Sequence, residues 1–239
     1  MHQETLTYRA DGVTMRSQLM FEPAPGPRAA VLVFPEAFGL DARAISRAER
    51  LAALGYVAVA CDLHGEGRVI DDLQKAMTQL QPLFEDPART RARALGALLA
   101  LSARPEVDQA RIAAIGFCFP MSLELARSGA EIKAVVGFHT SLATKAPVAA
   151  PGAIKARVLV CIGADDPFIP ATQRAEFESE MRNTGTNWQM NIYGRTVHSF
   201  TNDEAAKRNM PEAIRYNPEA DARAWASALD LFARVLGSS

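Results

Sequence analysis

The chain has 239 residues, of which 49% are hydrophobic and 22% charged, and its net charge at pH 7 is −1. These values are typical of a globular chain with room for a sizeable core, and they argue against a nucleic-acid partner, which calls for a basic surface. The N-terminal segment is polar, without the apolar stretch of a signal peptide, and no apolar run approaches the length of a membrane span.

The three cysteines, Cys61, Cys118 and Cys161, form an odd set without paired spacing. This pattern predicts free thiols and a reducing, cytoplasmic location. Cys61 and Cys161 lie in apolar runs, which favours a place in the core. The sequence contains neither CxxC nor HExxH, so we expect no metal site and no cofactor.

Strands and helices are expected to alternate along the chain. The first two strands, 4–9 and 13–22, are predicted to form a hairpin through the Asp11-Gly12 turn. Further buried strands are expected at 29–34, 56–61, 111–115, 132–138, 158–162 and 188–193. Helices are expected at 42–54, 71–83, 87–102, 121–127, 171–182 and 220–236, with long loops at 139–156 and 194–217.

This alternation predicts one α/β domain over residues 1–239, with a mostly parallel central sheet and helices on both faces. Ligands of such sheets bind beyond the carboxyl ends of the strands. Polar residues follow the predicted strands closely: Glu36, Asp62, His64, Cys118, His139, Asp166 and His198. We therefore expect a site at this edge of the sheet.

The stretch RIAAIGFCFPM, residues 111–121, predicts a strand, a sharp turn and the start of a helix. A nucleophile exposed on such a turn is the arrangement of the nucleophile elbow, and the acid and the histidine then follow in chain order. Cys118, Asp166 and His198 fit that order. The sequence thus predicts a thiol nucleophile in an α/β-hydrolase fold.

The predicted roles follow from the chemistry of a thiol, which needs a base to become a nucleophilic thiolate. His198 would accept the proton and later deliver it to the leaving group, while Asp166 would orient the imidazole. Two backbone N–H groups, of Phe119 and Ala37, would form the oxyanion hole. The other interpretation of Asp166 is a turn residue before Pro167, without a catalytic role.

Several spaced motifs resemble the dienelactone hydrolase family: VLVFPEAFGL, GYVAVACDLHG, IGFCF, GADDPFIP and GRTVHSF. The resemblance covers essentially the whole chain. It implies a Cys-His-Asp triad that hydrolyses a small carboxylic ester or lactone, like a carboxymethylenebutenolidase, through an acyl-enzyme. It further implies that Glu36 contacts the resting thiol, and it matches Asp166, rather than Asp165, to the family's aspartate. A helix cap is the other interpretation of Glu36.

Two departures from the family pattern leave an alternative open. Pro120 and Met121 stand where the family carries a glycine pair, and Asn202 stands where members acting on dienelactone carry an arginine that holds the substrate carboxylate. The alternative is a non-catalytic protein that binds small molecules and has a distorted elbow. Arg68 is a candidate substitute for the missing positive charge.

The remaining residues predicted to bind the substrate flank the strand ends. They are Phe38, Arg68, His139, Phe168 and Phe200. The alternative interpretation of the aromatic residues is that they belong to the core. For His64 and His139 we favour a role in lining the pocket or in structural hydrogen bonds over a role in catalysis. The expected partner is a small-molecule ester or lactone, with no nucleic acid and no membrane.

Overall fold

A computed structural model describes residues 1–237; the last two residues of the predicted domain, 238–239, lie outside the described residues. Within residues 1–237 the chain forms an eight-stranded sheet of order β1-β2-β4-β3-β5-β6-β7-β8. The strands are β1 (His2–Ala10), β2 (Val13–Phe21), β3 (Arg28–Phe34), β4 (Val57–Ala60), β5 (Val107–Phe117), β6 (Ala134–Phe138), β7 (Arg157–Gly163) and β8 (Trp188–Tyr193).

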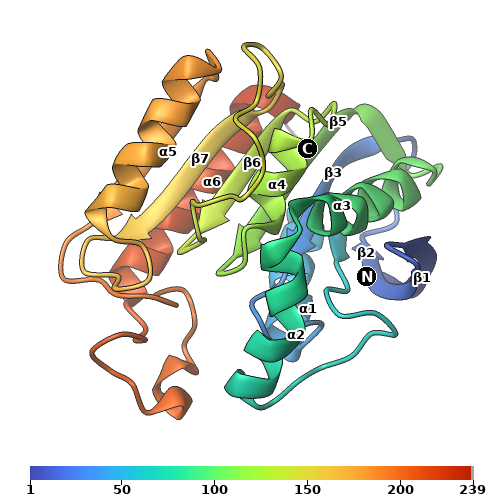
Figure 1. The fold of residues 1–239 in the computed structure, drawn as a ribbon. Coiled ribbons are helices and arrows are strands. Elements are labelled where there is room, and N and C mark those ends of the chain that lie inside the picture. The colour runs from blue at the N-terminus through green and yellow to red at the C-terminus, as the bar shows by residue number, and fades with distance from the viewer. Residues whose placement is uncertain (238–239) are drawn as a thin grey trace.

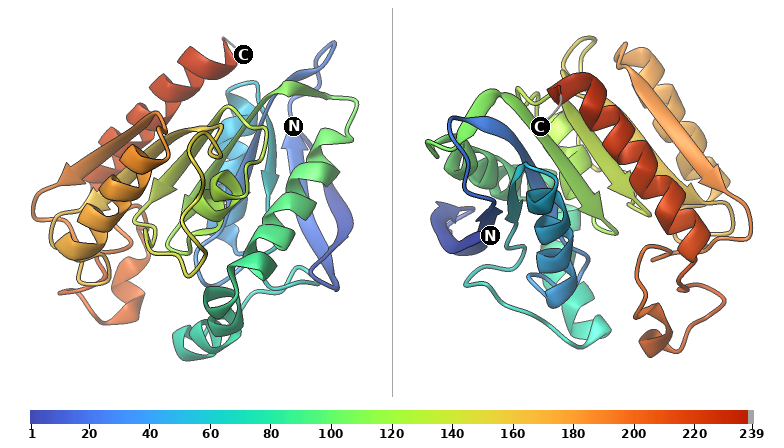
Figure 2. Two further views of the ribbon diagram at one scale, coloured as in Figure 1. Left: turned by 45° about the horizontal axis from the view of Figure 1, so that its top comes forward. Right: turned by 180° about the vertical axis from the view of Figure 1, so that it is seen from behind.

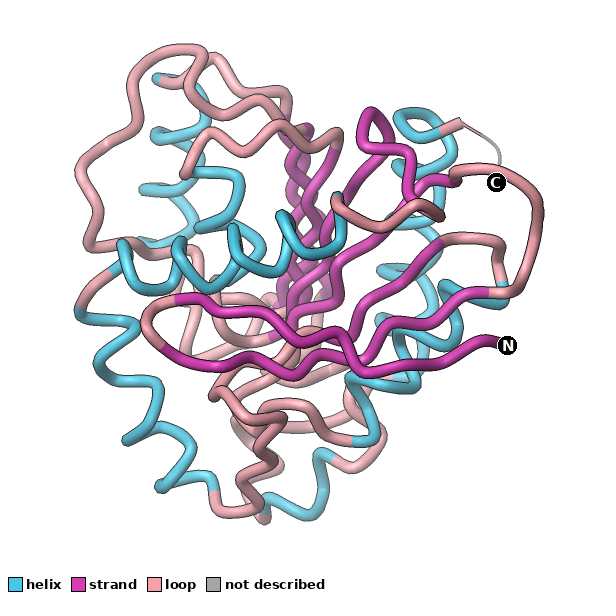
Figure 3. Tube along the Cα trace, turned by 90° about the vertical axis from the view of Figure 1, so that its right-hand side faces the viewer, coloured by secondary structure: helices cyan, strands magenta, loops and turns pink. Residues whose placement is uncertain are grey.

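The sheet is parallel from β4 through β8, and only β1 and β2 run antiparallel to their neighbours. The β1–β2 hairpin turns at Asp11 and Gly12, both with positive φ. Seen from the side in Figure 3, this hairpin is strongly rotated against the later strands, as the twist of a large sheet requires. The expected parallel sheet with one hairpin is confirmed.

Helices cover both faces of the sheet (Figures 1 and 2). On one face lie α1 (Ala42–Ala53) and α6 (Pro218–Leu236); on the other lie α2 (Leu73–Glu85), α3 (Pro87–Ser102), α4 (Met121–Arg127) and α5 (Ala171–Asn183). Each face has its own apolar core, because the buried strands present side chains alternately to the two layers.

Every predicted strand and helix is present, with small shifts at the ends. The largest difference is β5, which begins at Val107 instead of residue 111, because Val107 pairs with Arg28 ahead of an irregularity in the β3–β5 ladder. The long loop at 194–217 contains one short 3-10 helix, Ala205–Arg208. None of the helices described between residues 1 and 237 has the length and apolar character needed to cross a membrane.

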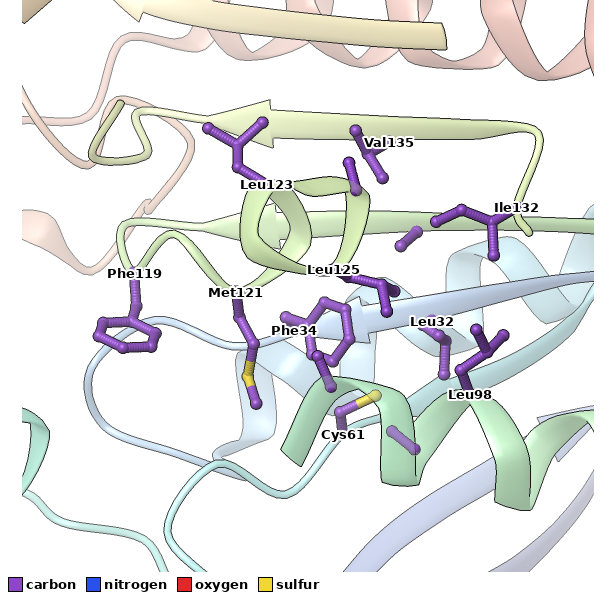
Figure 4. Packing of buried hydrophobic residues seen from close by; sticks show 14 of the residues in the cluster. Leu32, Phe34, Cys61, Leu98, Phe119, Met121, Leu123, Leu125, Ile132 and Val135 are labelled. Carbon is purple, nitrogen blue, oxygen red and sulfur yellow. The ribbon is translucent and has the colours of Figure 1, made fainter. Parts of the chain in front are cut away.

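The packing beneath the predicted elbow is dense. Figure 4 shows Met121 and Leu125 of α4 gathered with Phe34 of β3 above helix α3, and the sulfur of Cys61 lies in the same cluster. Cys61 and Cys161 are both fully buried, so their predicted place in the core is confirmed. This packing fixes the junction between β5 and α4 from below.

Candidate active site

Cys118 lies in the turn between β5 and α4, at the carboxyl edge of the sheet. Its φ is +60°, a conformation that non-glycine residues seldom adopt and that is held here by the surrounding structure. The side chain is only half-buried, whereas Cys61 and Cys161 are fully buried. The turn therefore presents the Cys118 sulfur to a cavity rather than to the core.

The turn is tight because strand and helix approach closely at Gly116. A Cβ atom at Gly116 would lie 2.6 Å from Oγ of Ser122 on the first turn of α4. Ser122 is itself fully buried and donates to Val136 O at 3.3 Å, so it faces away from the cavity as a structural residue. Glycine at position 116 is thus required by space.

Pro120 is accommodated at the beginning of α4. It is the N-cap residue, with φ −77°, and its carbonyl accepts the first helical hydrogen bond from Glu124 N at 2.8 Å. A cap residue needs no N–H of its own inside the helix, so the strand–turn–helix path forms with proline in place. In the same turn the Phe119 N–H donates to Phe117 O at an N···O distance of 2.6 Å.

His198 and Asp166 form a buried pair. Nδ1 of His198 donates to Oδ2 of Asp166 at 2.8 Å, and both side chains are at most 8% exposed. The neighbouring Asp165 is exposed, so the structure selects Asp166 as the partner of the imidazole. A histidine held through Nδ1 in this way directs Nε2 away from the carboxylate, where it can exchange a proton with a neighbouring group.

The pKa of His198 is strongly perturbed. Burial opposes its protonation, but the negative charge of Cys118 and the hydrogen bond with Asp166 outweigh this effect and raise the pKa to about 10. The imidazole is therefore protonated at neutral pH when the Cys118 sulfur carries a negative charge.

Glu36 lies at the base of the same cavity. Asn202 Nδ2 donates to its two carboxylate oxygens at 3.3 and 3.2 Å. Burial raises the pKa of the Glu36 carboxyl, while the Asn202 hydrogen bond and the charge of His198 partly oppose this. Asn202 therefore binds Glu36, and Arg208 is the arginine that borders this cavity.

His139 supports this region from below. It is fully buried, and its Nε2 is hydrogen-bonded to Oγ1 of Thr201 at 2.9 Å. The centroid of its ring lies 5.1 Å from the centroid of the His198 ring. Burial, and then the charges of His198 and Arg47, lower the pKa of His139 well below its usual range. His139 is thus a neutral structural residue.

The loop after β3 is fixed by His64. Its Nε2–H donates to Ala37 O at 2.8 Å, and burial lowers the pKa of His64. Asp62 in turn accepts hydrogen bonds from the backbone of Arg16, His64, Gly65 and Gly67. The Ala37 N–H donates to no backbone oxygen within residues 1–237, so it is available at the cavity.

A cavity of about 370 Å³ opens above Cys118. Its walls combine the predicted reactive residues with a largely apolar lining. The lining residues include Glu36, Ala37, Phe38, Leu73, Met77, Phe84, Cys118, Ser141, Phe168, Ile169, His198, Asn202, Arg208, Met210 and Ile214. Among the described residues, no group of three or more His, Cys, Asp or Glu is arranged to hold a metal ion.

Of the five residues expected to bind substrate, only Phe38 and Phe168 lie on this cavity. The expectation is wrong for Arg68, whose guanidinium is exposed and folds back on its own loop to Gly65 O and His64 O. It is also wrong for His139 and Phe200, whose rings pack against each other and are fully buried, so that neither borders the cavity.

The sequence analysis missed the walls contributed by α2 and the 194–217 loop. Leu73, Met77 and Phe84 of α2 lie on the cavity, whereas Ala76, Leu80 and Leu83 of the same helix are buried in the core. The spacing of a second apolar stripe on α2 was the available signal. Arg208, whose guanidinium carbon lies 3.6 Å from the centroid of the Phe38 ring, carried no recognisable pattern.

The sheet order, the elbow-like turn and the residues beyond β5, β7 and β8 define an α/β-hydrolase fold. The model of the dienelactone hydrolase family matches residues 16–236, nearly the entire chain. The chain belongs to the dienelactone hydrolase family, as the sequence motifs predicted.

Two solved structures resemble the chain over its full length. One is named m3DLH, with 44% identity, a TM-score of 0.93 and 98% of each chain covered. The other is P91, described as a dienelactone hydrolase-like promiscuous phosphotriesterase from metagenomic libraries, with 40% identity, a TM-score of 0.94 and 99% of each chain covered.

Curated relatives are more distant. A putative carboxymethylenebutenolidase of Methylorubrum extorquens is 27% identical, covering 81% of this chain and 70% of the relative. A probable 2-oxo-3-(5-oxofuran-2-ylidene)propanoate lactonase of Bradyrhizobium is 26% identical, and the match covers 79% of this chain and 81% of the relative. The names of these relatives agree with a hydrolase.

Proposed function

We propose that the protein hydrolyses small carboxylic esters or lactones through Cys118, His198 and Asp166, by way of an acyl-enzyme. The observation that carries this proposal is the 2.8 Å bond between His198 Nδ1 and Asp166 Oδ2, together with the place of Cys118 and His198 on one cavity. The family membership and the names of the relatives support the same reaction class.

In the proposed reaction the Cys118 sulfur, as thiolate, attacks the carbonyl carbon, and the carbonyl electron pair moves to its oxygen. The tetrahedral intermediate collapses to a thioester, and the leaving alkoxide takes the proton from Nε2 of His198. A water molecule then attacks the thioester and gives a proton to His198. The second intermediate expels the thiolate and releases the acid. Asp166 orients the imidazole throughout.

The proposed oxyanion hole uses the N–H groups of Ala37 and Phe119. The hydrogen bond from His64 to Ala37 O fixes the loop that carries the first donor. The Phe119 N–H also donates to Phe117 O at an N···O distance of 2.6 Å. The substrate oxyanion and the Phe117 carbonyl would therefore share this donor. Loss of one oxyanion donor commonly costs about 10²–10³ in kcat.

We assign Glu36 a part in the activation of the thiol, since it borders the same cavity as Cys118 and its carboxyl group is buried. Asn202 holds both oxygens of this carboxylate and so is not free to bind a substrate carboxylate. The largely apolar wall favours esters or lactones with apolar groups beside the carbonyl. Dienelactone, which is a carboxylate, fits this wall less well.

The experiment is a comparison of Cys118→Ala with wild type on a p-nitrophenyl ester of a short acid. We expect turnover to fall by at least about 10³, because the residue that forms the acyl-enzyme is absent. Cys161→Ala is the matched control: it removes a buried thiol that is not part of the cavity lining, and turnover should stay within a few-fold of wild type. Full turnover by Cys118→Ala would refute the proposal.

The non-catalytic alternative predicts a different result with a covalent probe. An ester-like inhibitor should label Cys118 in wild type, and His198→Ala should abolish the labelling if His198 activates the sulfur. A folded wild-type protein that binds such compounds but neither reacts nor turns over would favour the binding protein instead.

Phosphotriesters are a second candidate substrate class, because P91, at 40% identity over 99% of the chain, is described as a promiscuous phosphotriesterase. The same thiolate would attack phosphorus and displace an aryloxide. Paraoxon hydrolysis that is lost in Cys118→Ala would establish this activity, and no release of p-nitrophenolate by wild type would dismiss it.

A further inference from the structure

A second cavity, of about 140 Å³, lies directly beside the one above Cys118. The two cavities share the residues Phe84 and Ser141 in their walls. The other walls of the second cavity are formed by Leu83, Pro87, Thr90, Pro120, Ala143 and Thr144, among others. Pro120, one of the departures from the family pattern, thus faces this space.

Phe84 borders both cavities, and its side chain is termed the partition. It lies near the end of α2, is half-buried, and its ring packs edge-on against Phe119 with centroids 4.5 Å apart. Phe119 follows the predicted nucleophile directly. On the opposite side, Ser141 N donates to Cys118 O at 2.9 Å. Cys118 and Phe84 border the same cavity, so an acyl group on the sulfur would extend into a space that the partition bounds.

The second cavity suits an uncharged occupant. Leu83, Pro87, Pro120 and Ala143 give it apolar walls. The charged groups at its border already have partners. Lys145 pairs with Glu85, and Glu124 accepts from Arg91 at 2.9 Å and from Arg127 at 3.0 Å. Space for a water needs only about 10–15 Å³ of such volume, so the cavity has room for several methylene groups.

We propose that Phe84 sets the acyl-chain length of the substrate. Its ring closes the second cavity against the first, so that wild type is restricted to short acyl chains, and a smaller residue at position 84 opens the second cavity to a linear alkyl chain. The proposal rests on the hydrolase function proposed above and specifies its substrate class further.

The size of the effect follows from the burial of methylene groups. Each additional methylene taken from water into an apolar cavity favours the bound state by a factor of about four. An octanoyl chain carries several methylenes more than an acetyl chain. Opening the partition is therefore expected to raise the octanoate-to-acetate ratio of kcat/KM at least about tenfold, even if only some of these groups enter.

The experiment measures kcat/KM for p-nitrophenyl esters from acetate to decanoate. Phe84→Ala should shift the preferred chain to greater length, and Phe84→Leu, which retains more of the packing on Phe119, should do so to a smaller extent. Ala143 borders only the second cavity, so Ala143→Trp added to Phe84→Ala should fill that cavity and restore the short-chain preference.

Gln81→Ala is the matched control, because Gln81 is exposed on the same helix and borders neither cavity. It should leave the octanoate-to-acetate ratio within about twofold of wild type. The proposal is overturned if both Phe84 variants keep the wild-type ratio, if Gln81→Ala gives the same increase, or if wild type already prefers octanoate.

Failure of the proposed function gives a different result. A folded wild-type protein that turns over none of these esters refutes the hydrolase itself and the chain-length proposal with it. An active wild type with an unchanged profile in the Phe84 variants refutes the chain-length proposal alone.

Discussion

The electrostatics of the site centre on one residue, His198. Its ring is buried between the Asp166 carboxylate and the Cys118 sulfur, and two negative groups outweigh the cost of burying the imidazolium. His139 lies only 5.1 Å away but is held neutral by burial and by the charge of His198. The pKa values of two adjacent imidazoles are thus shifted in opposite directions: Cys118 and Asp166 raise that of His198, and burial lowers that of His139.

The titration of His198 tests this interpretation. Cys118→Ala removes a negative neighbour that favours the protonated ring, so the pKa of His198 should fall from about 10 toward its ordinary value of about 6.5. NMR titration of the ring protons, assigned with His198→Asn, measures the shift. Asp166→Asn should lower the pKa too. An unchanged pKa in both variants would contradict the interpretation.

At the scale of elements, the site depends on the junction of β5 and α4. Gly116 allows the strand to approach Ser122 of the helix, and the core beneath, with Met121 and Phe34, holds the helix against the sheet. The positive φ of Cys118 is the result of this constraint. The junction therefore positions the sulfur through the packing of the strand against the helix.

Gly116→Ala should destabilise the protein by about 1–3 kcal/mol, because the added methyl would lie 2.6 Å from Oγ of Ser122 and overpack the junction. Urea unfolding measures the loss, and the reactivity of Cys118 with a thiol reagent reports the displaced sulfur. Gly194→Ala is the matched control: no atom lies within 4 Å of its added Cβ, so it should be neutral or slightly stabilising. Equal effects of the two substitutions would show that space at Gly116 is not limiting.

For the whole molecule, the raised pKa of His198 makes stability depend on pH. A histidine binds its proton with a pKa of about 6.5 in the unfolded chain and about 10 in the folded one. The resulting stabilisation is fully present below pH 6.5 and is lost as the pH rises through 10.

We therefore expect the unfolding free energy of wild type, relative to His198→Gln, to decrease between pH 6.5 and pH 10. Urea unfolding at several pH values measures this difference, and the comparison cancels the contribution of titrating groups that do not interact with His198. A difference that stays constant across this range would show that the ring carries no raised pKa.

The elements were accessible to prediction because each depends on local pattern. The apolar runs of β3, β5, β6 and β7 are signals within a few residues, and all four strands appear in the structure. The candidates Cys118, Asp166 and His198 were accessible as well, because every parallel strand ends at the same edge of the sheet. The second apolar stripe of α2, which includes Phe84, was overlooked beside the stripe that packs on the core.

By itself the sequence determined the strand–helix order, the family and the residues that follow each strand, since these depend on periodicity and motif. Only the tertiary structure decided which of those residues meet. It buried His139 and Phe200, turned Arg68 back on its own loop, placed Asn202 on Glu36, and put Phe84 between two cavities. The reason is physical: a side chain's orientation and neighbours are fixed by packing between distant segments, and no local pattern encodes that packing.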